Sequence, residues 1–289
     1  EKKQLKKQRR KNQKLWAFLR KNRKEDPQNA EKKRRWRLFR KKAKAADAAE
    51  LATPAPKPKE AEAEEAPSNF AMAPLTFGVK RGELCAIVGS VGSGKSSLLL
   101  GAIGEMHKVS GDVTWGAKRI AYCAQSAWIQ NATLRDNVLF GLPLGDGARY
   151  HAVLEACALR SDLAQLERGD LTPVGEDGTE LSGGQKARVA LARAVYSRAG
   201  VLLLDDVLSA VDAHTAKHLA ERLLGSALLD GRTVLLVSHN VPLVAKHMRH
   251  VVLLDGGAVA FQGTSDAFLA SPLYTGLRDA EHARPAADR

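Results

Sequence analysis

The sequence predicts an α/β domain whose largely parallel sheet is covered by helices on both faces, with a flexible basic extension before it. Short apolar runs, continuous as in strands buried on both sides, recur at Leu84–Val88, Arg119–Cys123, Val201–Leu204, Thr233–Val237 and His250–Leu254. Helical stretches separate these runs, namely Lys95–Gly104, Arg149–Leu166, Gly184–Arg198 and His214–Leu224. This alternation indicates parallel strands joined by helices.

The positive charge of the chain lies in its N-terminal part. The formal net charge is +13, and residues 1–68 hold 23 of the 45 Lys and Arg but only 10 of the 32 Asp and Glu. We expect residues 1–50 to be a basic, partly helical flank, which fits a solvated linker, a helix on an anionic membrane surface or a calmodulin-type target. Its first apolar cluster has the spacing of one helical face and consists of Leu15, Trp16, Phe18 and Leu19.

Composition divides the rest of the chain. Residues 51–68 are rich in Pro, Ala, Lys and Glu, which predicts a semi-rigid linker without a core. Residues 69–270 follow as the globular domain, and residues 271–289 as a C-terminal tail without a recognisable signal. The three cysteines lie far apart, which argues against a disulfide framework or a zinc site and indicates a reducing compartment. No apolar run exceeds seven residues, so no membrane-spanning helix is predicted.

A phosphate-binding loop follows the first apolar run and opens a helix, with the pattern G-x-x-x-x-G-K-[ST]. Its glycines let backbone N–H groups point at a phosphate, and the helix dipole adds positive potential. We expect Lys95 to neutralise phosphate oxygens, Ser96 to reach a Mg²⁺ ion and Ser97 to donate to phosphate. The candidate phosphate-binding residues are Gly89, Ser90, Gly92, Ser93, Gly94, Lys95, Ser96 and Ser97.

An acidic pair, Asp205 and Asp206, follows the run Val201–Leu204. In the sheet of a protein with such a phosphate loop, the strand that carries the metal-binding carboxylate lies near the loop. We therefore expect Asp205 to hold Mg²⁺. Asp206 stands where a general base would polarise the attacking water. Such a pair also fits a helix cap, but a phosphate loop upstream favours the catalytic interpretation.

The segment Leu181–Gln185, which reads L-S-G-G-Q, resembles the signature of ATP-binding cassette (ABC) transporter nucleotide-binding domains. The resemblance extends from Leu75 to about Gly263 and implies a P-loop NTPase of ABC type with a helical signature subdomain. It also implies that the signature closes over ATP held by a second cassette, so that two domains meet head to tail. The residues that would make this contact are Ser182, Gly183, Gly184 and Gln185.

Further motifs occur in the order of the family. Gln125 resembles the Q-loop glutamine that touches Mg²⁺ and water, and His239 resembles the switch histidine near the γ-phosphate. The resemblance thus implies Asp206, His239 and Gln125 as catalytic residues, and Ser96, Gln125 and Asp205 as the metal site. Three segments are more narrowly similar to the first cassette of the C subfamily, the multidrug-resistance-associated transporters: Ala124–Asn131, Asn137–Gly141 and Asp205–His214.

The chain departs from the family pattern at three places. Asp206 stands where most cassettes have Glu, and misplacing a general base by about 1 Å can cost roughly a hundredfold in rate, so we expect ATP binding with slow hydrolysis at this site. The aromatic residue that stacks on adenine should precede the first core strand, where Phe70 is the candidate, although core packing fits it as well. Val207 replaces a proline, with no assigned consequence.

The resemblance implies the cassette of a membrane exporter that binds Mg²⁺ and ATP and hydrolyses ATP, on the cytosolic face of an integral membrane transporter. Its expected partners are a second cassette, the transmembrane domains of the same transporter and, through the basic N-terminal segment, a membrane surface. The alternatives are a soluble ABC ATPase acting on the ribosome or nucleic acid, and a non-hydrolysing regulatory module. The neutral globular part and the exporter-type loop Gly175–Gly178 disfavour nucleic acid as a partner.

Overall fold

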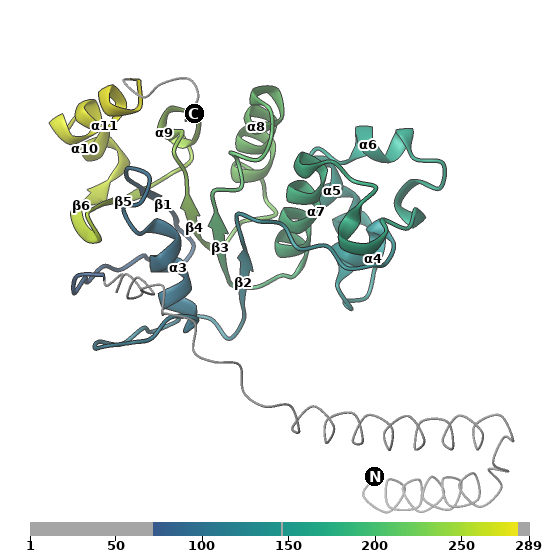
Figure 1. Cartoon of the computed structure of the whole chain (residues 1–289), viewed down its shortest axis with the longest axis horizontal. Coiled ribbons are helices and arrows are strands. Elements are labelled where there is room, and N and C mark those ends of the chain that lie inside the picture. The colour runs from purple at the N-terminus through teal and green to yellow at the C-terminus, as the bar shows by residue number, and fades with distance from the viewer. Residues whose placement is uncertain (1–71, 146, 283–289) are drawn as a thin grey trace, which may run out of the picture. The chain divides into compact units, whose positions relative to one another are not determined.

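The computed structural model describes residues 72–145 and 147–282, so the predictions for residues 1–50, residues 51–68 and Phe70 lie outside the described residues. A six-stranded sheet forms the centre, in the order β2-β3-β4-β1-β5-β6 (Figure 1). All neighbouring strands pair in parallel except β5 and β6, which confirms the predicted mostly parallel sheet. The strands are β1 (Leu84–Val88), β2 (Ile120–Cys123), β3 (Val201–Asp205), β4 (Thr233–Val237), β5 (His250–Asp255) and β6 (Ala258–Thr264).

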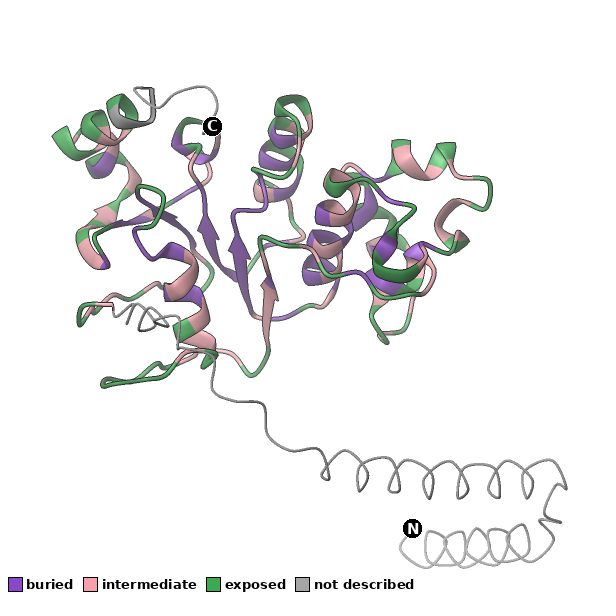
Figure 2. Cartoon of the chain, viewed as in Figure 1, coloured by how far each residue is buried: buried purple, intermediate pink, exposed green. Residues whose placement is uncertain are grey.

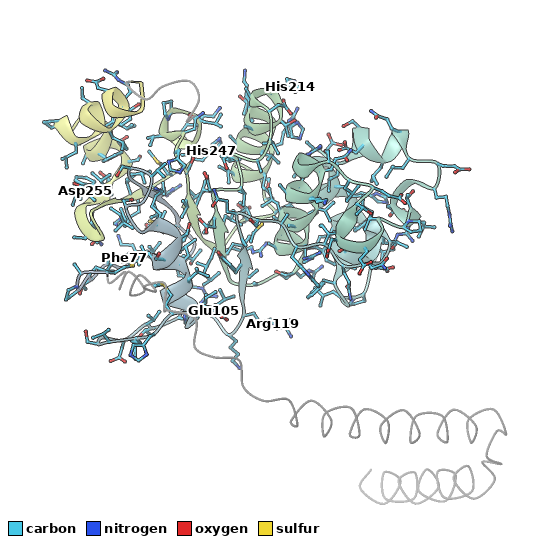
Figure 3. The ribbon with its side chains drawn as sticks, in the orientation of Figure 1. Phe77, Glu105, Arg119, His214, His247 and Asp255 are labelled. Carbon is cyan, nitrogen blue, oxygen red and sulfur yellow. The ribbon has the colours of Figure 1, made fainter. Side chains whose placement is uncertain are left out.

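The sheet separates two apolar layers, because successive side chains of a strand point to opposite faces. In β1, Ile87 belongs to the layer that includes Leu99 of helix α3 (Lys95–Ile103), while Val88 belongs to the other layer. Phe77 packs against the α3 layer (Figure 3). Every residue of β1, β3 and β4 is buried (Figure 2), so both faces are covered as predicted. The second layer is closed by α7 (Gly183–Tyr196), α8 (Ala213–Leu219), α9 (Val241–Val244) and α10 (Ser265–Leu269).

A group of helices lies beside the sheet, on the right in Figure 1, and ends in α7. Arg135 and Tyr150 hold it together through one carboxylate: Arg135 donates two hydrogen bonds to Asp170, at 2.8 and 2.9 Å, and the Tyr150 hydroxyl donates a third at 2.9 Å. The group agrees with the helical signature subdomain that the family resemblance implies. Its other helices are α4 (Leu134–Leu139), α5 (Ala148–Ala156) and α6 (Arg160–Gln165), with the short 3₁₀ helices η1 (Gly169–Leu171) and η2 (Glu176–Gly178).

The helical stretch predicted over residues 149–166 is divided in the structure into α5 and α6, with a break between them. Ala158 adopts a left-handed backbone with φ of 53°, and the Leu159 N–H bonds to the Leu154 carbonyl oxygen at 2.9 Å. This is the pattern of a Schellman C-cap, which ends a helix and turns the chain. Similarly, the helix predicted over residues 214–224 is α-helical only to Leu219 and continues as the π-helical turn η3 (Ala220–Leu224).

Besides the short helices α4, α9, α10, η1 and η2, two longer elements were not predicted. Strand β6 pairs antiparallel with β5 through a two-residue turn, Gly256–Gly257, where both residues have positive φ, at 53° and 80°. The predicted tail contains helix α11 (Pro272–His282), whose Tyr274 and Leu277 pack against the core. In residues 72–145 and 147–282, no helix combines the length and the apolar character needed to cross a bilayer.

Candidate functional site

The glycine-rich loop leaves the carboxyl end of β1, a strand in the interior of the sheet. A Cβ at Gly89 would lie 2.2 Å from the Leu254 carbonyl oxygen, so only glycine fits there. Gly92 and Gly94 have φ of 80° and 96°, in the left-handed region that glycine adopts at little cost. Helix α3 then begins without a side-chain cap, and this leaves its first N–H groups available to an anion.

Lys95 is buried inside this loop, with 6% of its surface exposed. Its Nζ donates to the Gly89 carbonyl oxygen at 3.0 Å and to the Ser90 carbonyl oxygen at 2.7 Å. The ammonium group therefore fixes the path of the loop and places a positive charge at its centre. Ser93 Oγ is also buried and has no hydrogen-bond partner among the residues that the structure describes.

Asp205 lies at the carboxyl end of β3 and is 2% exposed. Its Oδ1 accepts a hydrogen bond from Ser96 Oγ at 3.0 Å, which brings together two of the three residues predicted to hold Mg²⁺. Its Oδ2 accepts a hydrogen bond from the Tyr122 hydroxyl at 3.2 Å. A hydroxyl and a carboxylate are hard oxygen donors of the kind that Mg²⁺ prefers, so this pair fits the ion.

Asp206 follows with a left-handed backbone, at φ of 51°, and is 6% exposed. Its Oδ2 lies 3.4 Å from Gln125 Nε2 and 3.7 Å from His239 Nε2, so the three predicted catalytic side chains meet at this carboxylate. Burial raises the pKa of Asp206, and the neighbouring Asp205 adds to this effect. Ser209, His239 and Lys95 act in the opposite direction on that pKa.

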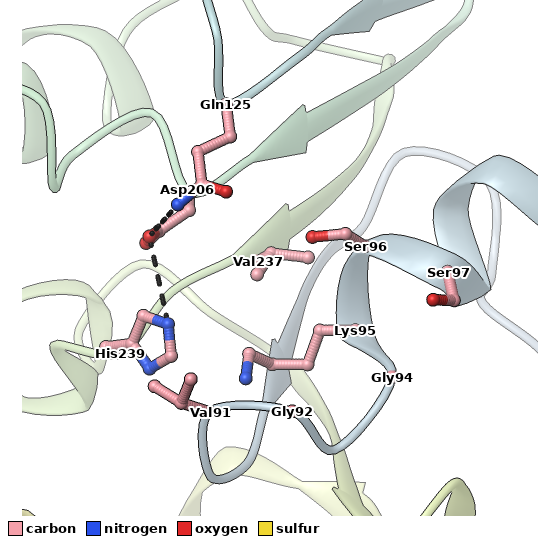
Figure 4. A pocket seen from close by; sticks show the side chains of 10 residues that line it. All are labelled: Val91, Gly92, Gly94, Lys95, Ser96, Ser97, Gln125, Asp206, Val237 and His239. Atoms are coloured by element: carbon pink, nitrogen blue, oxygen red, sulfur yellow. Dashed lines mark hydrogen bonds and ion pairs between the residues drawn. The ribbon is translucent and has the colours of Figure 1, made fainter. Parts of the chain in front are cut away.

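An open pocket of about 400 Å³ joins the phosphate loop with Gln125, Asp206 and His239, and Asp205 lies outside its lining (Figure 4). The loop and the start of α3 form one side, and the carboxyl ends of β3 and β4 with the segment after β2 form the other. This is the edge of a parallel sheet at which ligands usually bind. The lining residues are Val91, Gly92, Gly94, Lys95, Ser96, Ser97, Gln125, Asp206, Val237 and His239.

Most of the predicted site residues thus lie together. Gly89, Ser90 and Ser93 belong to the same loop but do not line the pocket, and Phe70 lies outside the described residues. Tyr122 was not predicted, because its contact with Asp205 depends on the pairing of β2 with β3. Val91 and Val237, apolar residues that line the pocket, were not predicted either, because they belong to no motif of their own.

The signature residues lie at the start of α7 and do not line this pocket. Ser182 Oγ accepts from the Gln185 N–H at 3.3 Å, and Gln185 Oε1 accepts from the Ser182 N–H at 2.9 Å, which forms a capping box. Gln185 Nε2 donates to Asp162 Oδ1 at 2.9 Å, and Arg188 pairs with Asp162 at 2.6 Å. The start of α7 is therefore held rigidly from α6, while Ser182 and Gly183 are exposed.

Replacing Asp206 with Asn is expected to stabilise the folded chain near neutral pH. The folded chain keeps the Asp206 proton at pH values where the unfolded chain has lost it. The cost of the buried charge is therefore fully present above the raised pKa and disappears as the pH falls below it. Urea denaturation should give Asp206→Asn a higher free energy of unfolding than the original chain at neutral pH. This difference should shrink in acid.

The control is Asp177→Asn, because Asp177 shares the left-handed backbone, at φ of 51°, but is exposed. It isolates the preference of Asn for this conformation from the effect of burial. Equal gains in the two variants, or a gain for Asp206→Asn that does not depend on pH, would contradict a buried charge as the cause.

Comparison with known proteins identifies the region that carries the site. Residues 72–209 match the ABC transporter family. A pleiotropic ABC efflux transporter of multiple drugs from Candida glabrata is 44% identical over 220 residues, which is 71% of this chain and 13% of the relative. The human ATP-binding cassette sub-family C member 2 is 46% identical over 197 residues, 68% of this chain and 13% of the relative. The human ATP-binding cassette sub-family C member 3 is 50% identical over 183 residues, which is 63% of this chain and 12% of the relative.

The chain thus matches only a small part of each relative. The family match over residues 72–209 includes the phosphate loop, the Asp205–Asp206 pair and the signature. The order of these motifs and their meeting at one edge of a mostly parallel sheet agree with the family match. Residues 72–209 are therefore an ATP-binding domain of the ABC transporter family, with relatives in sub-family C.

Proposed function

We propose that this chain is the ATP-binding cassette of a membrane exporter, which binds Mg²⁺ and ATP between two cassettes and powers transport by hydrolysing ATP. The observation that carries the proposal is the meeting of Lys95, Ser96, Gln125, Asp206 and His239 in one pocket. The sub-family C relatives support the exporter, and the Candida glabrata relative is described as an efflux transporter of multiple drugs. Because the match covers 12 to 13% of these relatives, the transport activity is part of the proposal.

The loop and Lys95 would bind the phosphates of ATP, the loop through its N–H groups and Lys95 through its charge. Ser96 and Asp205 would hold Mg²⁺ with Gln125 nearby, and the ion would neutralise charge on the phosphate oxygens. The Asp206 carboxylate would accept a proton from a water molecule, and His239 and Gln125 would restrict where that carboxylate points. The reaction is cleavage of a phosphoanhydride by water, aided mainly by positioning and by neutralisation of charge.

A second cassette would complete the site. The exposed Ser182 and Gly183, at the N-terminus of a helix held by Asp162, suit the phosphates of ATP bound to a partner. The other proposed partners are the transmembrane domains of the same transporter and, through residues 1–50, the inner membrane surface. With these partners the chain would lie at the cytosolic face of a membrane. Its own site would hydrolyse ATP slowly, because the Asp206 side chain is shorter than that of Glu.

Complementation between two inactive variants tests the shared site. Lys95→Ala removes the charge from the loop, and Ser182→Ala removes the signature hydroxyl. Each variant alone should have little ATPase activity at a concentration where the chain pairs. A mixture should regain part of it, since one mixed site combines an intact loop with an intact signature. No recovery in a mixture that does pair, or equal turnover in diluted monomers, would contradict the proposal. ATP consumption limited to a single turnover would favour the regulatory module instead.

A further inference from the structure

Tyr122 stands on the face of the sheet that leads to the metal carboxylate. It lies opposite Leu203 in the parallel pairing of β2 with β3, and both pack in the layer covered by α3. Asp205 is two residues after Leu203, so its side chain leaves the same face of the sheet one step further along. The Tyr122 ring thus packs beside the strand that carries Asp205, with its hydroxyl 3.2 Å from Asp205 Oδ2.

The two oxygens of Asp205 have different partners. Oδ1 accepts from Ser96 Oγ at 3.0 Å, while Oδ2 accepts from the Tyr122 hydroxyl. The carboxylate is 2% exposed, so bulk water cannot easily replace a lost donor.

The other carboxylate of the site has its own set of neighbours. Asp206 Oδ2 faces Gln125 and His239. Tyr122 contacts Asp205, at the end of the carboxylate away from Ser96. A change at Tyr122 is therefore expected to act on the metal side of the site and not on the side where water would be activated.

We propose that Tyr122 is a positioning residue that holds the Asp205 carboxylate with Oδ1 turned toward Ser96, and so sets the affinity of the ATP site for Mg²⁺. The proposal rests on the function proposed above. Without the hydroxyl, the carboxylate is free to rotate and to leave Ser96, and partners of this kind typically contribute roughly 10- to 100-fold to metal affinity. The ring itself remains useful as packing against Leu203, so the hydroxyl and the ring have separable roles.

The test is Tyr122→Phe in the full chain, with Mg²⁺ titrated against binding of a fluorescent ATP analogue. We expect the Mg²⁺ concentration for half-maximal binding to rise about tenfold, while affinity for the analogue in EDTA is unchanged. The matched control is Tyr150→Phe. It removes a tyrosine hydroxyl that also donates to a carboxylate, that of Asp170 in the helical group. The control should leave the Mg²⁺ titration as in the original chain.

A second measurement needs no variant. With tyrosine labelled at the ring carbon that bears the hydroxyl, the NMR signal of Tyr122 should shift when Mg²⁺ is added to the ATP-loaded chain, and the Tyr150 signal should not. An unchanged titration in Tyr122→Phe, an equal change in Tyr150→Phe, or a Tyr122 signal indifferent to Mg²⁺ would overturn this inference. Failure of the original chain to bind the analogue with Mg²⁺ would overturn the proposed function itself.

Discussion

Replacing Lys95 with Ala is expected to weaken binding of a fluorescent ATP analogue by about a hundredfold. The variant loses the positive charge in the loop together with the bonds to the Gly89 and Ser90 carbonyl oxygens. A hydrogen bond to a charged group contributes about 1.5–3 kcal/mol, and about 2.7 kcal/mol corresponds to a hundredfold in affinity. The loss should appear both with Mg²⁺ and in EDTA, because Lys95 would act on the phosphates and not on the metal.

The matched control is Lys108→Ala. Lys108 pairs with Asp112 at 3.2 Å, but both side chains are largely exposed, so its charge contributes little to stability. Thermal unfolding followed by circular dichroism separates a loss of folding from a loss of binding. If the Lys95→Ala chain is folded but binds the analogue weakly, the loss lies in the site. An affinity for the analogue within twofold of the original chain would contradict the role assigned to Lys95.

The fold was predictable because its central strands β1, β3 and β4 are buried on both faces. Continuous apolar runs such as Leu84–Val88 and Thr233–Val237 have no polar face to present to water, and the helices between them supply the cover. The helix break at Ala158 was not predictable in this way, because alanine favours helix and adopts the left-handed conformation only when the surrounding chain imposes it. In contrast, Gly256–Gly257 did carry a hairpin signal that would have identified β6.

The candidate site was predictable for a geometric reason. The loop after β1, Gln125 after β2, Asp205 and Asp206 at the end of β3 and His239 after β4 all follow parallel strands. The carboxyl ends of such strands share one edge of the sheet, so residues far apart in the chain meet there. Tyr122 was missed because it lies inside a strand. Its role depends on which residue of β3 it faces, and only the register gives that.

Replacing Asp206 with Glu is expected to raise the ATPase rate of the paired chain by up to about a hundredfold. Asp206 Oδ2 lies 3.4 Å from Gln125 Nε2 and 3.7 Å from His239 Nε2, both longer than a close hydrogen bond, and it borders an open pocket with room for one more methylene. The longer side chain would carry the carboxylate toward the water that it must polarise. Release of phosphate at saturating Mg²⁺ and ATP measures the gain, and an unchanged rate would contradict the proposal that the short Asp206 side chain slows hydrolysis.

The free energy of unfolding of Asp206→Glu should fall while its ATPase rate rises. This combination distinguishes a catalytic gain from a better-folded chain. Glu is less suited than Asp to the left-handed backbone at φ of 51°, where residues other than Gly, Asn and Asp lose about 1–2 kcal/mol. The control Asp177→Glu places the same substitution on a backbone with φ of 51° outside the pocket. It should lower the free energy of unfolding by a similar amount and leave the ATPase rate unchanged. A faster ATPase in the less stable Asp206→Glu chain would then be assigned to the position of the carboxylate.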